Sequence, residues 1–242
     1  MRIAALYDIH GNLPALEAAL GDVRSRRVDR VVVGGDVLPG PMPRESLELL
    51  WSLDVPVTCI TGNGEVAVLA ERAGRDSGVP AQYRGTMQWV AGALSDEHVG
   101  RIESWPMTVR LGDVLFCHAT PRSENEIFVR TTDEARLVPI VTAAGARMVV
   151  CGHTHMAFDR TIGGVRVVNA GSVGMPFGEP GAHWILIDGG VEFVRTPYDL
   201  AAAAARIRAT DFPGAAAFAE RNVVHPPSEA EMLAAYSRAE LT

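Results

Sequence analysis

The chain has few cysteines, no long apolar run and no excess of basic residues. Its three cysteines all lie inside apolar stretches, which indicates a reducing, cytoplasmic environment and not a disulfide framework. No apolar run is as long as a membrane span, and Met1-Arg2 leads directly into a predicted strand without a signal peptide. The net charge of −7, with no stripe of basic residues, argues against nucleic-acid binding. We therefore expect a cytoplasmic protein with no membrane partner.

The composition is that of an ordinary globular protein. Hydrophobic residues make up 48% and charged residues 21% of 242 residues, which is enough chain for one large domain or two small ones. No internal repeat or low-complexity linker interrupts it, so we expect a single domain over residues 1–242. Its core should span about 1–197, and a helical tail about 198–242. This tail packs either on its own domain or against a second subunit, which would make a homo-oligomer.

Strands and helices alternate in the first hundred residues, whereas short strands dominate after residue 107. We expect strands at 2–7, 30–33 and 56–61, helices from Leu13 and over 43–53, and a helical stretch at 64–104 with a break at 74–80. We expect later strands at 109–111, 114–117, 148–151, 165–169, 184–188 and 191–195, with a helix near 132–145.

Five short polar blocks each follow an apolar run with the length of a buried strand. They are Asp8-Ile-His10-Gly-Asn12, Gly34-Gly35-Asp36, Gly62-Asn63, Cys117-His118 and Gly152-His153-Thr-His155. Asp8 and Asp36 are 28 residues apart, and Asp36 and Asn63 are 27 apart, which is one βαβ unit each. These three blocks should therefore lie side by side at the same edge of one sheet. Two Asp, one Asn and four His suit a pair of divalent metals.

Each block alone has a simpler explanation. Asn12 is placed to cap the helix that starts at Leu13, Gly-Gly-Asp and Gly-Asn are common turn sequences, and His118 could be a hydrogen-bonded core residue. Cys117 and Cys151 are best explained as small buried hydrophobic residues, with metal ligation as the alternative. The joint pattern favours a metal site, because every block ends a predicted strand and supplies a metal donor.

The ordered blocks resemble the calcineurin-like metallophosphoesterase superfamily, and Asn169-Ala-Gly-Ser-Val-Gly174 resembles its small bacterial phosphodiesterase branch. The resemblance runs from Asp8 to about residue 195. It implies an α/β fold, a four-layer α/β/β/α sandwich of two mixed sheets flanked by helices. It also implies one metal held by Asp8, His10, Asp36 and His155, and a second held by Asp36, Asn63, His118 and His153.

The resemblance implies a dimetal phosphoesterase that hydrolyses phosphodiesters or small phosphomonoesters through a hydroxide bridging the two ions. Asn63, His118 and His153 are the residues expected to act in catalysis. The mixed donors suit Mn²⁺ first, with Fe or Zn²⁺ as alternatives. A protein or nucleotide phosphatase on the same scaffold is the alternative enzyme. A non-catalytic partner-binding scaffold is disfavoured because every ligand position is filled.

The chain departs from the family pattern at Gly64. Many members carry a histidine directly after the Gly-Asn pair, where it helps the leaving group depart. Loss of a general acid lowers the rate on the order of 10²–10⁴-fold, so we expect a preference for acidic leaving groups. We also expect that a histidine at position 64 would raise turnover of poor leaving groups. Glu65 is either a substitute acid or a capping residue of the next helix.

Three other side chains are candidates for substrate binding: Asn12, Ser172 and Arg122. Ser172 either faces the phosphate or lies in a turn before the next strand. Arg122 follows His118 by four residues and contacts either a substrate anion or a surface carboxylate. Large side chains of the helical stretch either wall the cleft or belong to the core; they are Tyr83, Met87, Trp89 and Trp105.

Overall fold

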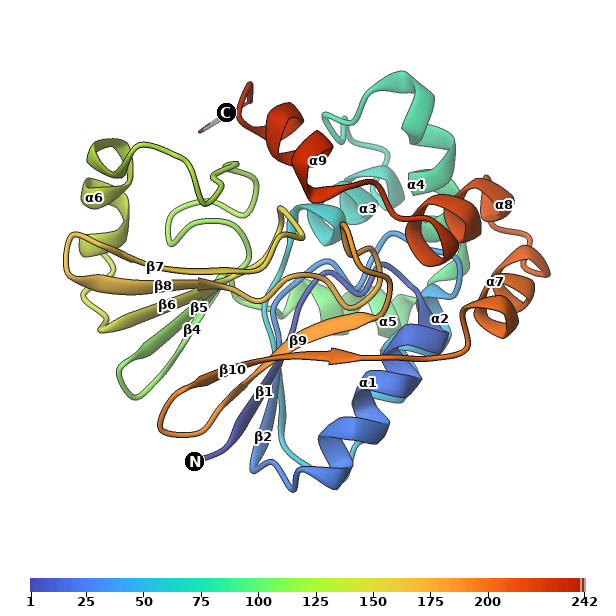
Figure 1. The fold of residues 1–242 in the computed structure, drawn as a ribbon. Coiled ribbons are helices and arrows are strands. Elements are labelled where there is room, and N and C mark those ends of the chain that lie inside the picture. Colours follow the sequence, from blue (N-terminus) through green and yellow to red (C-terminus); the bar gives the residue numbers. More distant parts are fainter. Residues whose placement is uncertain (240, 242) are drawn as a thin grey trace.

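Two five-stranded mixed sheets face each other in the computed structural model, which describes residues 1–239 and 241 (Figure 1). The first sheet contains β1 (Ile3–Leu6), β2 (Arg30–Val33), β3 (Val57–Cys59), β9 (Ala182–Ile187) and β10 (Val191–Thr196). Its order is β10-β9-β1-β2-β3, in which β1, β2 and β3 are parallel and β9 is antiparallel to both of its neighbours. The predicted parallel βαβ arrangement is therefore confirmed.

The second sheet contains the strands from the middle of the chain. They are β4 (Thr108–Leu111), β5 (Val114–Cys117), β6 (Met148–Cys151), β7 (Phe158–Ile162) and β8 (Val165–Asn169). Their order is β4-β5-β6-β8-β7, with β5, β6 and β8 parallel. Four of these strands match the predicted ranges to within one residue.

The apolar runs are continuous because the strands are buried on both faces. In β1, Ile3, Ala5 and Tyr7 face the second sheet, whereas Ala4 and Leu6 face helices. Helices α1 (Leu13–Ser25), α2 (Pro43–Trp51) and α7 (Leu200–Arg208) share a core with the outer face of the first sheet, and α6 (Glu134–Thr142) covers the second. The result is the predicted four-layer α/β/β/α sandwich.

The predicted helical stretch is divided among α3 (Asn63–Arg72), α4 (Ala81–Ala93) and α5 (Asp96–Glu103), with the expected break between α3 and α4. Some large side chains of this stretch lie in the core, and others lie at the surface. Trp89 and Trp105 pack against the core of the first sheet, whereas the Tyr83 side chain is 54% exposed.

The tail folds back over the molecule after β10. Beyond α7 it forms α8 (Ala215–Phe218), a π-helix η1 (Ala219–Val224) and α9 (Glu229–Tyr236); residues 240 and 242 of the predicted tail lie outside the described residues. Figure 1 shows α9, in red, at the top of the molecule. Met232, Leu233 and Tyr236 of α9 pack against Met156 and Phe177 from the loops after β6 and β8.

Two features differ from the expected pattern. Strand β7 was not predicted because its central residues, Asp159, Arg160 and Thr161, are polar and only its end residues are buried, which is typical of an edge strand. The last two strands return to the first sheet, where β9 pairs with β1. Among the described residues, no helix combines the length and apolar character needed to cross a bilayer.

Candidate metal centre

All five polar blocks follow the carboxyl ends of strands. Asp8 follows β1, Asp36 follows β2 and Asn63 begins α3 after β3, while His118 and the His153–His155 segment follow β5 and β6. Because β1, β2 and β3 are parallel within one sheet, and β5 and β6 within the other, the blocks of each sheet leave by the same edge. The two edges meet, and the side chains from both sheets form one cluster.

The backbone is strained where these side chains converge. Of the seven described non-glycine residues with positive φ, five are candidate ligands. They are Asp8 (54°), His10 (49°), Asp36 (51°), His153 (66°) and His155 (57°). A left-handed conformation costs about 1–2 kcal/mol at such residues. This strain is characteristic of functional sites, where the surrounding fold holds side chains in positions that the local sequence does not favour.

A first group of ligand atoms comes from Asp8, His10 and His155, all buried. His155 Nε2 lies 3.4 Å from Asp8 Oδ1 and 3.2 Å from His10 Nε2. Asp8 Oδ2 accepts a hydrogen bond from the His153 N–H at 2.9 Å, but Asp8 Oδ1 has no hydrogen-bond partner among the described residues. A buried carboxylate oxygen without a partner is unfavourable unless a cation binds it, so this group fits a metal ion.

A second group comes from Asp36, His118 and His153. His118 Nε2 lies 3.4 Å from Asp36 Oδ1 and 3.1 Å from Asn63 Oδ1. The other oxygen, Asp36 Oδ2, lies 3.7 Å from His10 Nε2 of the first group. Asp36 therefore faces both groups, each through a different oxygen.

Backbone carbonyl groups orient the histidine rings. The Nδ1 atoms of His10, His118 and His155 each hydrogen-bond a carbonyl oxygen, which leaves Nε2 directed at the centre. The carbonyls are those of Pro39, Gly34 and Met175, at 3.2, 2.8 and 2.7 Å. His153 has the opposite arrangement, because its Nε2 lies 3.1 Å from the Asn125 carbonyl and Nδ1 is left free.

The electrostatics of the cluster favour a cation. Burial raises the pKa of Asp36, but His118 and His10 outweigh burial and hold this pKa below its usual range. Burial would lower the pKa of His118, but Asp36 and Asp8 raise it to about 10. Burial and the nearby His118 lower the pKa of His153 to about 4. The buried carboxylates thus stabilise positive charge between them.

Glu65 is fully buried and accepts hydrogen bonds from the loop that carries Asp36. Its Oε2 accepts from the N–H groups of Asp36 and Gly62, both at 2.8 Å, and its Oε1 accepts from the Leu38 N–H at 2.9 Å. Burial and the nearby Asp36 raise the pKa of Glu65 to about 7, against the effect of these donors. Of the two expectations for Glu65, the structure supports a capping residue of α3.

Gly64 is closely surrounded, which argues against the expectation that a histidine there would raise turnover of poor leaving groups. Its N–H donates to Asp36 Oδ1 at 2.7 Å. A Cβ atom at this position would lie 2.1 Å from the Leu38 carbonyl oxygen and 2.9 Å from Asp36 Oδ1. Any side chain would displace the loop after β2, and Asp36 with it.

Two of the residues expected to bind substrate, Asn12 and Ser172, instead hydrogen-bond backbone groups of the protein. Asn12 caps α1 by accepting from the Ala15 N–H at 3.3 Å, and it donates to the Gly174 carbonyl at 2.8 Å. Ser172 Oγ donates to the Asp8 carbonyl at 2.7 Å. Both side chains are buried, so they hold the loops after β1 and β8 together.

Arg122 forms a salt bridge with a surface carboxylate, which was the alternative expectation for this residue. Its Nη2 is 2.6 Å from Glu126 Oε1, and its side chain is 59% exposed. It lines a separate hollow with Thr108 and Leu115, which contains none of the candidate metal ligands.

Two hollows meet at the centre and share His10, Pro39 and Met87. We call the first, of about 510 Å³, the Gly64 hollow; it is lined by Asp36, Asn63, Gly64, Val66, Ala67, Ser77, Gly78, Val79, Pro80, Glu124, Asn125 and the shared residues. We call the second, of about 630 Å³, the tail hollow, because more than half of its lining residues belong to the tail. The sequence analysis missed these tail residues, since no local pattern links them to the blocks.

The known proteins most relevant to this arrangement are metallophosphoesterases and uncharacterized relatives. The model of the calcineurin-like phosphoesterase superfamily domain matches residues 1–189. The uncharacterized protein MJ0912 of Methanocaldococcus jannaschii is 27% identical over 224 residues, covering 82% of this chain and 88% of that protein.

Solved structures show the same fold. A metallophosphoesterase from Sphaerobacter thermophilus has a TM-score of 0.74 and 26% identity, covering 92% of this chain and all of that one. The hypothetical protein PH1004 from Pyrococcus horikoshii has a TM-score of 0.79 and 19% identity, covering 94% and 99%. Since the family model spans far more than half of the sequence, the chain belongs to the calcineurin-like phosphoesterase superfamily and is a metal-dependent phosphoesterase.

Proposed function

We propose that the protein hydrolyses phosphodiesters or small phosphomonoesters with two divalent metal ions. The observation that carries this proposal is the pair of ligand groups joined by Asp36, together with the unpartnered oxygen of Asp8. One ion would be held by Asp8, His10, Asp36 and His155, and the other by Asp36, Asn63, His118 and His153. The His, Asp and Asn donors favour Mn²⁺, with Fe or Zn²⁺ as alternatives.

The bound ions would supply a nucleophilic hydroxide and positive charge for the phosphoryl oxygens. The protein's part is to hold the donors rigidly. The carbonyls of Gly34 and Met175 orient His118 and His155, and the Gly64 N–H orients Asp36. Asn63, His118 and His153 are the proposed catalytic residues, because together with Asp36 they would hold the second ion.

No side chain at position 64 is present to donate a proton to the leaving group. Gly64 has no side chain, and Glu65 is fully buried beneath the loop. We therefore propose that substrates with acidic leaving groups react fastest, since they depart without a proton donor. We also infer a reducing, cytoplasmic location, which the free thiols of Cys117 and Cys151, buried at strand ends, support.

The test uses the full chain, stripped of metal and then supplied with Mn²⁺. We expect hydrolysis of bis-p-nitrophenyl phosphate to return, with two ions per chain by elemental analysis. The Asp36→Asn variant keeps an oxygen for the Gly64 N–H but removes the charge that joins the two ligand groups. Its rate should fall on the order of 10³-fold because charge stabilisation of the transition state is lost.

Asp113→Asn is the matched control, because Asp113 is an exposed residue in the turn between β4 and β5. It should keep the rate of the unmodified protein. A protein that binds no divalent metal and hydrolyses no phosphoester with any of them would contradict the proposal. Wild-type turnover in Asp36→Asn would remove Asp36 from the centre.

A further inference from the structure

The tail hollow is an apolar cavity that opens directly onto the candidate metal centre. His10 and His155 form part of its lining, so a group in the hollow lies beside the first ligand group. Phe177 stacks on His155, with ring centroids 5.3 Å apart and planes at 24°, and Tyr236 of α9 follows at 6.2 Å from Phe177. An aromatic surface therefore extends from the metal centre to the tail.

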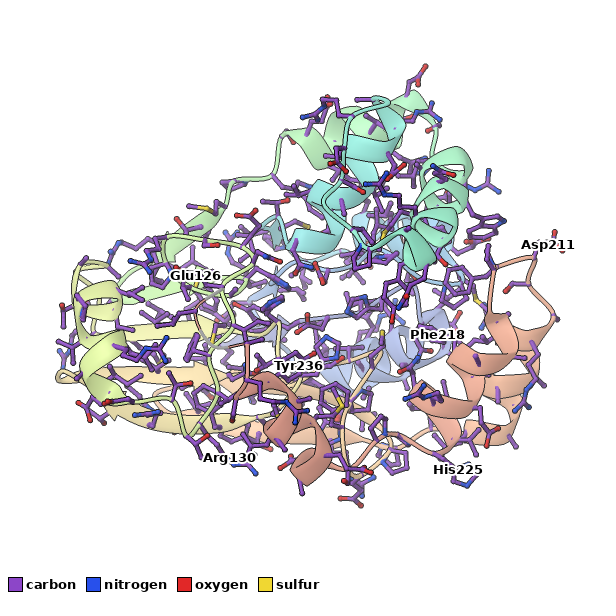
Figure 2. All side chains as sticks on the ribbon, turned by 90° about the horizontal axis from the view of Figure 1, so that it is seen from above. Glu126, Arg130, Asp211, Phe218, His225 and Tyr236 are labelled. Carbon is purple, nitrogen blue, oxygen red and sulfur yellow. The ribbon has the colours of Figure 1, made fainter. Side chains whose placement is uncertain are left out.

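Large apolar side chains from separate elements line the rest of the hollow. Met87 and the exposed ring of Tyr83 come from α4, and Phe212, Phe218 and Met232 come from the tail. Figure 2, which looks down on the molecule, shows Tyr236 near its middle and Phe218 to the right, on α9 and α8. An aromatic ring in the hollow would contact side chains of both α4 and the tail.

The charge of the hollow is unusual for this acidic chain. No Asp or Glu is among the residues found to line it, although the chain carries a net charge of −7. Arg221 of η1 does line it, and this arginine has no hydrogen bond or ion pair with any described residue. Its neighbour Glu220 is instead bound to Arg208 and His225. Arg221 is thus a guanidinium free to pair with an anion.

The hydroxyl group of Tyr236 adds a second donor. Burial raises the pKa of Tyr236 to about 12, and the carboxylates of Asp8 and Asp36 contribute in the same direction. The hydroxyl therefore keeps its proton at neutral pH. This hydroxyl and the Arg221 guanidinium are donors that favour a negatively charged ligand, and Asn222 adds an uncharged amide to the same side of the hollow.

We propose that the tail hollow binds one organic group of the phosphoester, and that this group combines an aromatic ring with an acidic substituent that pairs with Arg221. This inference rests on the proposed function, because the phosphoryl group is taken to lie on the metal centre. The ring stacks along Phe177 and Tyr83, and the acidic substituent reaches η1. A volume of about 630 Å³ accommodates a ligand of this size.

The experiment compares three diesters that share the p-nitrophenyl leaving group and differ in the other group. These groups are benzyl, 4-carboxybenzyl and 4-(trimethylammonio)benzyl. For the Mn²⁺-loaded full chain we expect kcat/KM to be highest for the carboxylate and lowest for the cation, with a spread on the order of 10-fold. In Arg221→Gln the KM values of the three diesters should become similar, because the side chain that distinguishes their charges is gone. Arg221→Lys should retain part of the spread.

Arg206→Gln is the matched control, because it also removes one positive charge from the tail, pairs with Glu17 and not with a neighbour of Arg221, and does not line the hollow. It should keep the spread of the unmodified protein. A spread that is unchanged in Arg221→Gln, or lost equally in Arg206→Gln, would overturn the assignment.

A binding measurement separates this inference from the proposed function. Calorimetric titration with 4-carboxybenzylphosphonate and benzylphosphonate needs no turnover, and we expect tighter binding of the carboxylated compound only when Arg221 is present. If no diester is hydrolysed but this difference is found, the proposed function fails and the anion-binding hollow stands. Equal affinities for both phosphonates would overturn the hollow even in an active enzyme.

Discussion

The Gly64 hollow and the tail hollow share His10, Pro39 and Met87 as lining residues. They differ in charge, in their other lining residues and in where those residues lie along the chain. The Gly64 hollow contains the carboxylates of Asp36 and Glu124, and all of its lining residues lie within the matched range 1–189. The tail hollow contains aromatic rings and Arg221, which has no partner among the described residues, and most of these side chains come from residues after 189. The Gly64 hollow therefore carries negative charge, whereas the tail hollow is more strongly apolar and carries a positive charge.

This difference suggests a division of roles. The loops after β1, β2, β5 and β6 carry the candidate metal ligands, and changes there should affect every substrate alike. The tail reaches the same centre from outside the matched range, and changes there should affect only substrates with a suitable organic group. Such a division is common, because a fixed scaffold presents the chemistry while variable segments select the ligand.

The largest effect beyond the metal ligands is expected at Glu65. Glu65→Gln leaves one side-chain oxygen for three N–H donors. Where that oxygen takes the place of Oε2 it still accepts from Asp36 and Gly62, but the buried Leu38 N–H loses its acceptor and the charge of the carboxylate is lost. We expect the free energy of unfolding to fall by about 3 kcal/mol, and turnover to fall equally for the benzyl and carboxybenzyl diesters. Urea unfolding and kinetics measure both. The exposed Glu103→Gln on α5 is the control; a loss confined to one diester would contradict the division of roles.

A smaller loss of stability is expected at Gly64. Gly64→His places Cβ against the Leu38 carbonyl, so the loop carrying Asp36 must move. We expect the free energy of unfolding to fall by about 2 kcal/mol, and turnover to fall for acidic and poor leaving groups alike. Thermal melting and kinetics with both kinds of leaving group check this. Gly85→Ala on α4, where a Cβ meets nothing, should be neutral or stabilising. Faster turnover of poor leaving groups would show that the loop tolerates the side chain.

The smallest effect is expected at the rim of the tail hollow. Tyr83→Ala removes an exposed ring without disturbing the core. We expect KM for the benzyl diester to rise about 3-fold, and KM for the corresponding ethyl diester to stay unchanged, because only the benzyl group stacks. Phe193→Ala on β10 removes another exposed aromatic ring, one that does not line the hollow, and is the control. Equal changes for the ethyl and benzyl diesters would argue against a stacking role.

Much of the fold was predictable from local sequence patterns, whereas one edge strand and one strand pairing were not. The parallel strands were predictable because both faces are buried and the apolar runs are unbroken, as in β2. Strand β7 was missed because its three central residues, Asp159, Arg160 and Thr161, are polar, which hides the apolar pattern of a strand at a sheet edge. The pairing of β9 with β1 joins Ile3 to Ile187, and no local pattern encodes a contact across that distance in the chain.

The candidate site was also only partly predictable from the sequence. The sequence indicated which residues are donors, but Asn12 and Ser172 proved to be bound to backbone groups of neighbouring loops. Arg122 is paired with Glu126, four residues away, a short-range partner that had been the alternative expectation. Polar residues near a site do not reveal by sequence alone whether they face the ligand or the loops that support it.

The sequence by itself determined the seven candidate ligands and their order, because each belongs to a polar block at the end of a buried strand; that these strands belong to two sheets whose edges meet was decided by the fold. The tertiary structure alone decided which atoms face each other, that the Leu38 carbonyl approaches Gly64, and that the tail brings Arg221 to the same centre. The reason is physical: strand formation depends on neighbouring residues, whereas these contacts join segments far apart in the chain and exist only when the whole core is packed.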